Sequence, residues 1–283
     1  MTSPSTASSA ALTTLPTIAF IGGGNMASAI IGGLIHQGHT ASQIEVVEPY
    51  APAREALLKS FGIAAQPEAG PALQRASIVV WAVKPQTFKD AATQARAHTA
   101  NALHLSVAAG IRSDSIAQWL GSERVVRTMP NTPALVGKGM SALYARPAVD
   151  AQERAQVEAI LASTGEFLWV ETEKQLDAVT ALSGSGPAYV FYFLEAMTRA
   201  GVDMGLSAQQ AHRLAVGTFV GASELARRSD EPPAVLRERV TSKGGTTYAA
   251  LQSLEASGVA TAFEAAMRAA EQRAHELGNE FGA

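Results

Sequence analysis

Cysteine is absent from the 283 residues of the sequence. Its absence excludes disulfides, a thiol nucleophile and cysteine-ligated metals, and it fits a reducing cytoplasm. A strong charge of either sign is also missing, since the net charge is −3 at pH 7 and no basic stripe is visible. No apolar run is long enough to cross a bilayer. We therefore expect a cytoplasmic protein that binds neither nucleic acid nor membrane.

Residues 1–15 contain no Lys or Arg and no apolar core of the kind that signal peptides carry. This composition argues against a secretory signal, and the lack of Arg argues against a mitochondrial transit peptide. The segment is rich in Ser, Thr and Ala, and we expect it to be a disordered N-terminal extension.

Short β-branched runs alternate with helical patterns as far as residue 172. This alternation predicts βαβ units in a mostly parallel sheet covered by helices on both faces. Two later runs could extend that sheet, with a helix at 151–162 between them. The expected strands are 18–21, 44–47, 78–81, 103–107, 125–126, 140–144 and 167–170.

Strand signals stop after residue 172, and we expect an all-α domain at 173–283. Ser207 followed by Gln210 forms a capping box, and Gly258 and Gly278 stand where helices should end. The stretch 189–197 is apolar on almost every face, which suggests burial against a partner subunit. The expected helices are 174–201, 207–228, 233–240, 246–256 and 259–277.

The first expected strand runs into a G-x-G-x-x-A loop and then a helix. In this setting Gly22 permits a tight turn, Gly24 lets the backbone approach a pyrophosphate, and Ala27 allows close packing of helix on strand. Asn25 and Met26 belong to the same loop and are candidate cofactor-binding residues. The N-terminus of the helix that follows offers free N–H groups, which favour an anion. A glycine-rich turn without ligand is the alternative. We interpret residues 16–172 as a dinucleotide-binding, Rossmann-type α/β domain with a doubly wound sheet.

Glu48 ends the second expected strand. An acid in this place binds the ribose hydroxyls of NAD and disfavours a 2′-phosphate. An exposed acid without ligand is the alternative, and Arg54 is near enough in sequence to accommodate a 2′-phosphate. The choice between NADH and NADPH therefore stays open.

Six stretches resemble the pyrroline-5-carboxylate reductase family, in the family's order, and the resemblance covers nearly the whole chain after residue 16. They are Gly-Gly-Gly-Asn-Met-Ala at 22–27, Val-Lys-Pro-Gln at 83–86, Ser-Val-Ala-Ala-Gly-Ile at 106–111, Arg-Thr-Met-Pro-Asn-Thr-Pro at 127–133, Thr-Ala-Leu-Ser-Gly-Ser-Gly-Pro-Ala-Tyr at 180–189 and Thr-Ser-Lys-Gly-Gly-Thr-Thr at 241–247. The resemblance implies NAD(P)H-dependent reduction of 1-pyrroline-5-carboxylate, a cyclic imine, to L-proline. It also implies a homo-oligomer, a dimer or a decamer built of dimers.

By the same resemblance, three turns at strand ends border the cofactor. They contribute Val83, Lys84, Pro85, Ala108, Ala109, Gly110 and Asn131. Lys84 could instead be ion-paired and structural, and Asn131, which stands between two prolines, is also a common turn residue. The small residues at 108–110 could serve tight helix packing as well as a flat nicotinamide ring.

Gly and Pro residues at 183–187 interrupt an otherwise helical pattern. Gly costs roughly 1 kcal/mol and Pro roughly 3 kcal/mol in a helix interior, relative to Ala. We therefore expect a kink or a close backbone approach there. The resemblance places this bend near the active site, at the join of the two domains.

A second glycine loop precedes the helix expected at 246–256. Its bare N–H groups and the helix N-terminus suit a carboxylate, although Ser, Thr and Gly often only cap helices. The resemblance assigns substrate binding to Ser242, Gly244, Gly245, Thr246 and Thr247. Thr247 is the candidate catalytic residue, as a hydrogen-bond donor to the imine nitrogen. Lys243 stands where some family members carry Pro.

Two alternatives remain. A β-hydroxyacid dehydrogenase-like oxidoreductase would use a lysine of the helical domain as acid and base, and only Lys174 and Lys243 follow residue 138. A non-catalytic dinucleotide sensor would bind cofactor without turnover.

His36 and His39 have helical spacing but no third ligand nearby, so we expect no metal.

Overall fold

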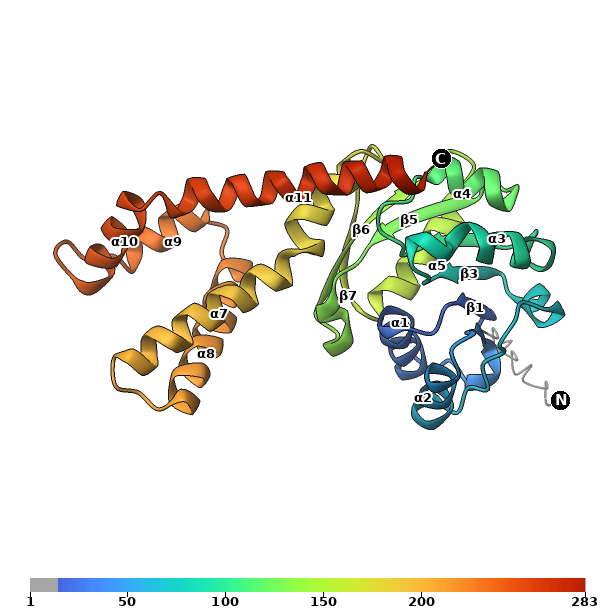
Figure 1. Ribbon diagram of the computed structural model, residues 1–283, viewed down its shortest axis with the longest axis horizontal. Coiled ribbons are helices and arrows are strands. Elements are labelled where there is room, and N and C mark those ends of the chain that lie inside the picture. The colour runs from blue at the N-terminus through green and yellow to red at the C-terminus, as the bar shows by residue number, and fades with distance from the viewer. Residues whose placement is uncertain (1–14, 283) are drawn as a thin grey trace, which may run out of the picture. The chain divides into compact units, whose positions relative to one another are not determined.

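The computed structural model describes residues 15–282 (Figure 1). The expected N-terminal extension therefore falls, apart from Leu15, outside the described residues. The chain divides into two compact units. The first contains the residues up to Leu176 together with those from Gly278 onward, and the second is Asp177–Leu277. The C-terminal segment's membership of the first unit was not expected from the sequence.

The first unit is built on a seven-stranded sheet of order β2-β1-β3-β4-β5-β6-β7. Strands β1 to β5 run parallel, β6 is antiparallel to β5, and β7 is parallel to β6. The expected mostly parallel sheet is therefore confirmed. Its strands are β1 (Ile18–Ile21), β2 (Ile44–Val47), β3 (Ile78–Trp81), β4 (Leu103–Ser106), β5 (Val125–Met129), β6 (Gly139–Ala145) and β7 (Gly165–Trp169).

Helices cover both faces of this sheet, because alternate side chains of each strand enter different cores. Ile18 and Phe20 of β1 join a core with α1, α2 and α5, whereas Ala19 and Ile21 join a core with α3 and α4. The helices are α1 (Asn25–His36), α2 (Ala51–Phe61), α3 (Pro85–Thr99), α4 (Ser113–Leu120) and α5 (Ala151–Ala162). Short 3-10 turns are η1 (Ala41–Gln43), η2 (Pro71–Arg75) and η3 (Thr132–Val136).

The second unit is helical. Its consecutive helices α7 and α8 pack side by side (Figure 1). Ser207 caps α8 as expected, because its Oγ accepts from Gln210 N at 3.3 Å while Gln210 Oε1 accepts from Ser207 N at 3.0 Å. The helices are α6 (Gln175–Val179), which crosses the boundary from the first unit, η4 (Thr180–Gly184), α7 (Gly186–Asp203), α8 (Ala208–Arg228), α9 (Pro233–Arg239), α10 (Thr246–Ala256) and α11 (Val259–Phe281). Within residues 15–282, no helix is both long and apolar enough to traverse a membrane.

The helix expected at 174–201 is not continuous. A π turn, η4, separates α6 from α7, and Ser185 N donates to Thr180 O at 2.8 Å. Pro187 has no N–H for the carbonyl one turn earlier, so the regular ladder cannot pass through it. The interruption expected at 183–187 is thus a widened turn at Thr180–Gly184, and Gly186 and Pro187 begin α7.

The expected helix end at Gly278 is wrong, because α11 continues to Phe281. Gly278 serves close packing instead. A Cβ on this residue would lie 3.3 Å from Nε of Arg112, which precedes α4. The glycine thus lets the last turn of α11 pack closely on the segment before α4, and both belong to the first unit.

Candidate cofactor and substrate sites

The glycine-rich loop after β1 lies against the loop after β3, since β1 and β3 are parallel neighbours. Gly22 has φ +98°, and a Cβ there would lie 2.5 Å from the carbonyl oxygen of Ala82. Only glycine fits this turn without displacing backbone. The loops therefore meet at the carboxyl edge of the sheet, where doubly wound folds bind ligands.

Gly24 plays a different part in the same loop. It is the N-terminal cap of α1, with φ −74°, and a Cβ on it would meet nothing within 4 Å. Gly24 and Asn25 are exposed, Met26 is half-buried, and Ala27 is fully buried beneath the helix. Open space in front of free helix N–H groups fits a pyrophosphate.

The carboxylate of Glu48 lies at this loop. Its Oε2 accepts from Gly23 N at 2.7 Å, and its Oε1 accepts from Tyr50 N at 2.8 Å. Arg54 donates from Nη1 to the carbonyl oxygens of Glu48 at 3.0 Å and Pro49 at 2.6 Å. The acid therefore stands beside the glycine loop, while the guanidinium holds the backbone that follows β2.

The turns after β3 and β4 offer mainly backbone. Lys84 is the exposed N-cap of α3, and Pro85 is the first residue of that helix. After β4, Ala108 is buried and donates from its N–H to Ser106 Oγ at 3.3 Å. Gly110 is half-buried with φ +73°. These turns can approach a flat ring closely because few side-chain atoms intervene.

Asn131 caps the 3-10 turn η3 after β5. Its Oδ1 accepts from Met140 N at 2.9 Å, which joins the turn to the start of β6. The side chain therefore has the turn role that the sequence left open. Contact with the cofactor stays a prediction.

The substrate loop expected from the sequence belongs to the second unit. Gly244 has φ +75°, and Gly245 N donates to Ser242 O at 3.0 Å, which closes a tight turn before α10. Within the described residues, the hydroxyls of Ser242, Thr246 and Thr247 make no hydrogen bond. These hydroxyls are therefore available to a ligand, and Thr247 is half-buried at the first turn of α10.

The sequence motifs did not reveal a partly buried cluster around Glu173. This carboxylate accepts from Ser113 and from Arg127, at the start of α4 and in β5. Arg127 opens one of the six motifs, but nothing near Glu173 in sequence signals its role. Only the tertiary structure brings these residues together.

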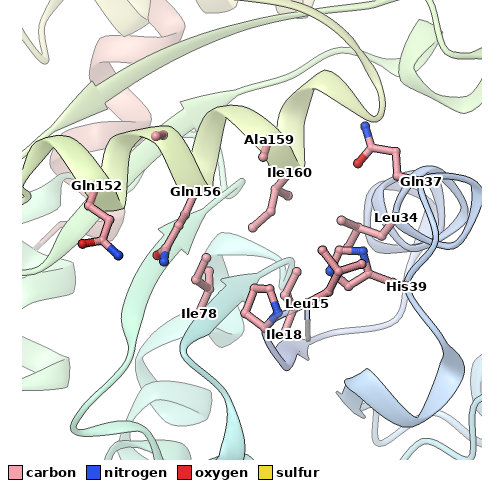
Figure 2. A pocket seen from close by; sticks show the side chains of 12 residues that line it. Leu15, Ile18, Leu34, Gln37, His39, Ile78, Gln152, Gln156, Ala159 and Ile160 are labelled. Carbon is pink, nitrogen blue, oxygen red and sulfur yellow. The ribbon is translucent and has the colours of Figure 1, made fainter. Parts of the chain in front are cut away.

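A separate cavity of about 390 Å³ lies at the opposite edge of the sheet (Figure 2). It is lined by Ile18 and Ile78, the first residues of β1 and β3, and by Gln152 and Gln156 of α5. Its place at the amino ends of the strands separates it from the glycine loop. In the part of the chain that is described, no three His, Asp or Glu residues cluster as metal ligands would.

Two family models match different parts of the chain, and full-length relatives match nearly all of it. Residues 173–277 match the model for pyrroline-5-carboxylate reductase dimerisation, and residues 17–110 match that for NADP oxidoreductase, coenzyme F420-dependent. The chain is 47% identical to pyrroline-5-carboxylate reductase from Pseudomonas aeruginosa over 270 residues, which cover 94% of this chain and 98% of the relative.

Solved structures agree. The chain is similar to pyrroline-5-carboxylate reductase from Coxiella burnetii, with a TM-score of 0.85 and 35% identity over 93% of this chain and 98% of the other. It is also similar to the Plasmodium falciparum enzyme with NADP bound, with a TM-score of 0.84 and 29% identity over 93% and 98%. The chain belongs to the pyrroline-5-carboxylate reductase family.

Proposed function

We propose that the protein reduces 1-pyrroline-5-carboxylate to L-proline with NADPH or NADH. The observation that carries this proposal is the presence of two separate glycine loops, each opening a helix, in a chain similar to these reductases over nearly its whole length. One loop suits a pyrophosphate and the other a carboxylate. A cytoplasmic location belongs to the same proposal.

The dinucleotide would lie along the carboxyl edge of the sheet. The loop at Gly22–Ala27 would hold its pyrophosphate, and the turns that begin at Val83, Ala108 and Asn131 would border its nicotinamide half. When bound, the dinucleotide supplies the hydride. The protein's part is to hold the two reactants in register and to exclude water.

The second glycine loop would hold the substrate. The N–H group of Gly244 and the hydroxyls of Ser242 and Thr246 would bind the carboxylate, while Gly245 shapes the loop through its own bond to Ser242 O. Thr247 would donate to the ring nitrogen. A protonated imine is the better hydride acceptor, so a donor at the nitrogen favours reduction. A threonine hydroxyl is a weak acid, and the proton would come from water or arrive with the substrate.

The test is Thr247→Ala, measured by proline formed and reduced dinucleotide consumed. The lost hydrogen bond should lower kcat by about 100-fold and leave cofactor affinity unchanged. Thr261→Ala, on the exposed face of α11, is the matched control and should keep full activity. Full activity of Thr247→Ala would remove Thr247 from the catalytic role.

We also propose that the Glu48 carboxylate disfavours NADPH relative to NADH, while both are accepted. The support is its position at Gly23 and the engagement of Arg54 with backbone carbonyls. Glu48→Gln removes the charge and should lower KM for NADPH several-fold, with KM for NADH unchanged or raised. An unchanged ratio of kcat/KM for the two cofactors would refute the role of Glu48.

We propose further that two copies of the chain associate through α7 and α8, in a dimer or in a decamer built of dimers. Helix α7 exposes Phe191 and Tyr192 by 62% and 65%, and α8 exposes Leu214 and Val220 by 60% and 65%. Large apolar side chains gathered on two packed helices favour burial in an interface. The match of residues 173–277 to a dimerisation model supports the same surface.

A further inference from the structure

Two segments that are far from α4 in sequence form hydrogen bonds with its first turn. One is Glu173, in the loop between β7 and α6, shortly before the first unit gives way to the second. The other is the end of α11, from Gly278 onward, where the chain returns to the first unit. Both contacts lie within the first unit.

Glu173 caps α4 from sixty positions away. Its Oε1 accepts from Ser113 N at 2.6 Å, and its Oε2 accepts from Ser113 Oγ at 2.6 Å. A carboxylate at a helix N-terminus satisfies free N–H groups and is attracted by the positive end of the helix. The neighbouring residue Arg112, which is the N-cap of α4, makes no side-chain cap bond, so Glu173 provides the cap.

The same carboxylate also holds β5. Arg127 donates from Nη1 to Glu173 Oε1 at 2.6 Å, and the two side chains are only 9% and 22% exposed. A charge-assisted bond between poorly exposed groups fixes geometry more firmly than one at the surface. Glu173 therefore fixes the start of α4 relative to the middle of β5.

The returning end of α11 reinforces this position. Ser115 Oγ donates to Gly282 O at 2.5 Å, and Arg112 Nη2 donates to Asn279 Oδ1 at 2.7 Å. Both bonds join residues 167 positions apart. Glu173, shortly before the helical unit begins, and the residues from Gly278 onward, after it ends, are thus both hydrogen-bonded to the first turn of α4.

In sequence, that turn lies between the expected nicotinamide loops. Helix α4 begins three residues after Gly110, and β5 ends at Met129, which is followed by the turn that contains Asn131. We propose that Glu173 is a positioning residue for imine reduction, which holds the loops at 108–110 and 129–131 in register through Ser113 and Arg127. This inference rests on the proposed function, because those loops border the nicotinamide only if the dinucleotide binds as proposed.

Glu173→Gln tests the role while keeping the size of the side chain. The amide removes the charge facing Arg127 and directs a donor toward either Arg127 or Ser113. Affinity for NADPH should fall roughly tenfold. Affinity for 2′-phospho-ADP-ribose, which lacks the nicotinamide, should not change, because the glycine loop is untouched. Calorimetric titration measures both without turnover.

Kinetics give a second readout. Glu173→Gln should lower kcat by roughly 10- to 100-fold, since a small misplacement of reacting groups has an effect of this size. The fall should be accompanied by a larger isotope effect with the 4-deuterated cofactor. Ser113→Ala removes the hydroxyl's bonds to Glu173 and Arg146 but keeps the bond from Ser113 N to Glu173. It should give an intermediate loss, which keeps the test valid if Glu173→Gln folds poorly.

Glu123→Gln is the matched control. Glu123 accepts from Arg146, is 63% exposed and touches neither Ser113 nor Arg127 itself. Arg146 also donates to Ser113 Oγ at 3.3 Å and to Asp114, so these bonds still hold Arg146 when the charge of Glu123 is removed. It should behave as the wild type. Equal loss of affinity for NADPH and for 2′-phospho-ADP-ribose, or wild-type values in Glu173→Gln and Ser113→Ala, would overturn the inference. Failure of the wild type to reduce the imine would instead overturn the proposed function.

Discussion

His104 should make the stability of the first unit depend on pH. This side chain is 1% exposed in β4, and its Nδ1 accepts from Trp81 Nε1 at 3.2 Å. The neutral ring therefore carries its proton on Nε2, which has no partner among the described residues. Burial, reinforced by the positive charge of Arg124, lowers the pKa of His104 from 6.5 to about 4.

The sign and size of the change in stability with pH follow from this lowered pKa. The unfolded chain takes up a proton near pH 6.5, whereas the folded chain does so only near pH 4. The contribution of neutral His104 to the free energy of unfolding is thus fully present above pH 6.5 and is lost as the pH falls toward 4. Each pH unit between the two pKa values corresponds to about 1.4 kcal/mol, so the whole loss is about 3 kcal/mol.

His104→Asn removes the titrating group and keeps an acceptor for Trp81. Its free energy of unfolding, from urea denaturation followed by circular dichroism, should fall less between pH 7 and pH 4 than that of the wild type. The difference should approach about 3 kcal/mol. His212→Asn, an exposed histidine of α8, controls for the substitution itself. Equal pH dependence in His104→Asn and the wild type would refute the reasoning.

Four further substitutions each test one position. Gly24→Asp should fold normally, because a Cβ at this position points into open space, but it should lose dinucleotide binding in a fluorescence titration. Gly22→Ala should instead destabilise the fold by about 1–3 kcal/mol, because Gly22 has a positive φ and a Cβ there meets Ala82 O. Asp150→Ala removes the cap that accepts from Glu153 N at 2.8 Å, and it should cost about 1 kcal/mol and lower Tm by roughly 3 °C. Phe191→Glu should give monomers in light scattering, and an unchanged oligomer would place the interface elsewhere.

Local patterns were sufficient for most of the first unit. The strands expected at 18–21, 44–47 and 78–81 and the helix at 151–162 have the bounds that the structure gives. Their buried β-branched runs, and the helix's acidic first turn, act within a few residues. The two glycine loops were likewise evident from sequence, because each needs only a glycine turn followed by a helix.

One prediction was wrong, that of a helix end at Gly278, and two features were not predicted; all three have non-local causes. Gly278 looked like a helix end, but its small size serves contact with Arg112, far away in the sequence. The antiparallel direction of β6 depends on how the turn at Asn131 joins its neighbours, and residue periodicity does not record strand direction. The role of Glu173 could not be predicted from local sequence either, because its partners Ser113 and Arg127 lie on α4 and β5.

The most direct test of the account is turnover of 1-pyrroline-5-carboxylate by the wild-type protein, with NADH and NADPH in parallel, followed by the loss of reduced-nicotinamide absorbance and by recovery of proline. The account predicts one proline formed for each cofactor oxidised. It also predicts that activity disappears in Gly24→Asp while the protein stays folded. Tight cofactor binding without oxidation of either cofactor would contradict it, and would favour a hydroxyacid substrate or a dinucleotide sensor.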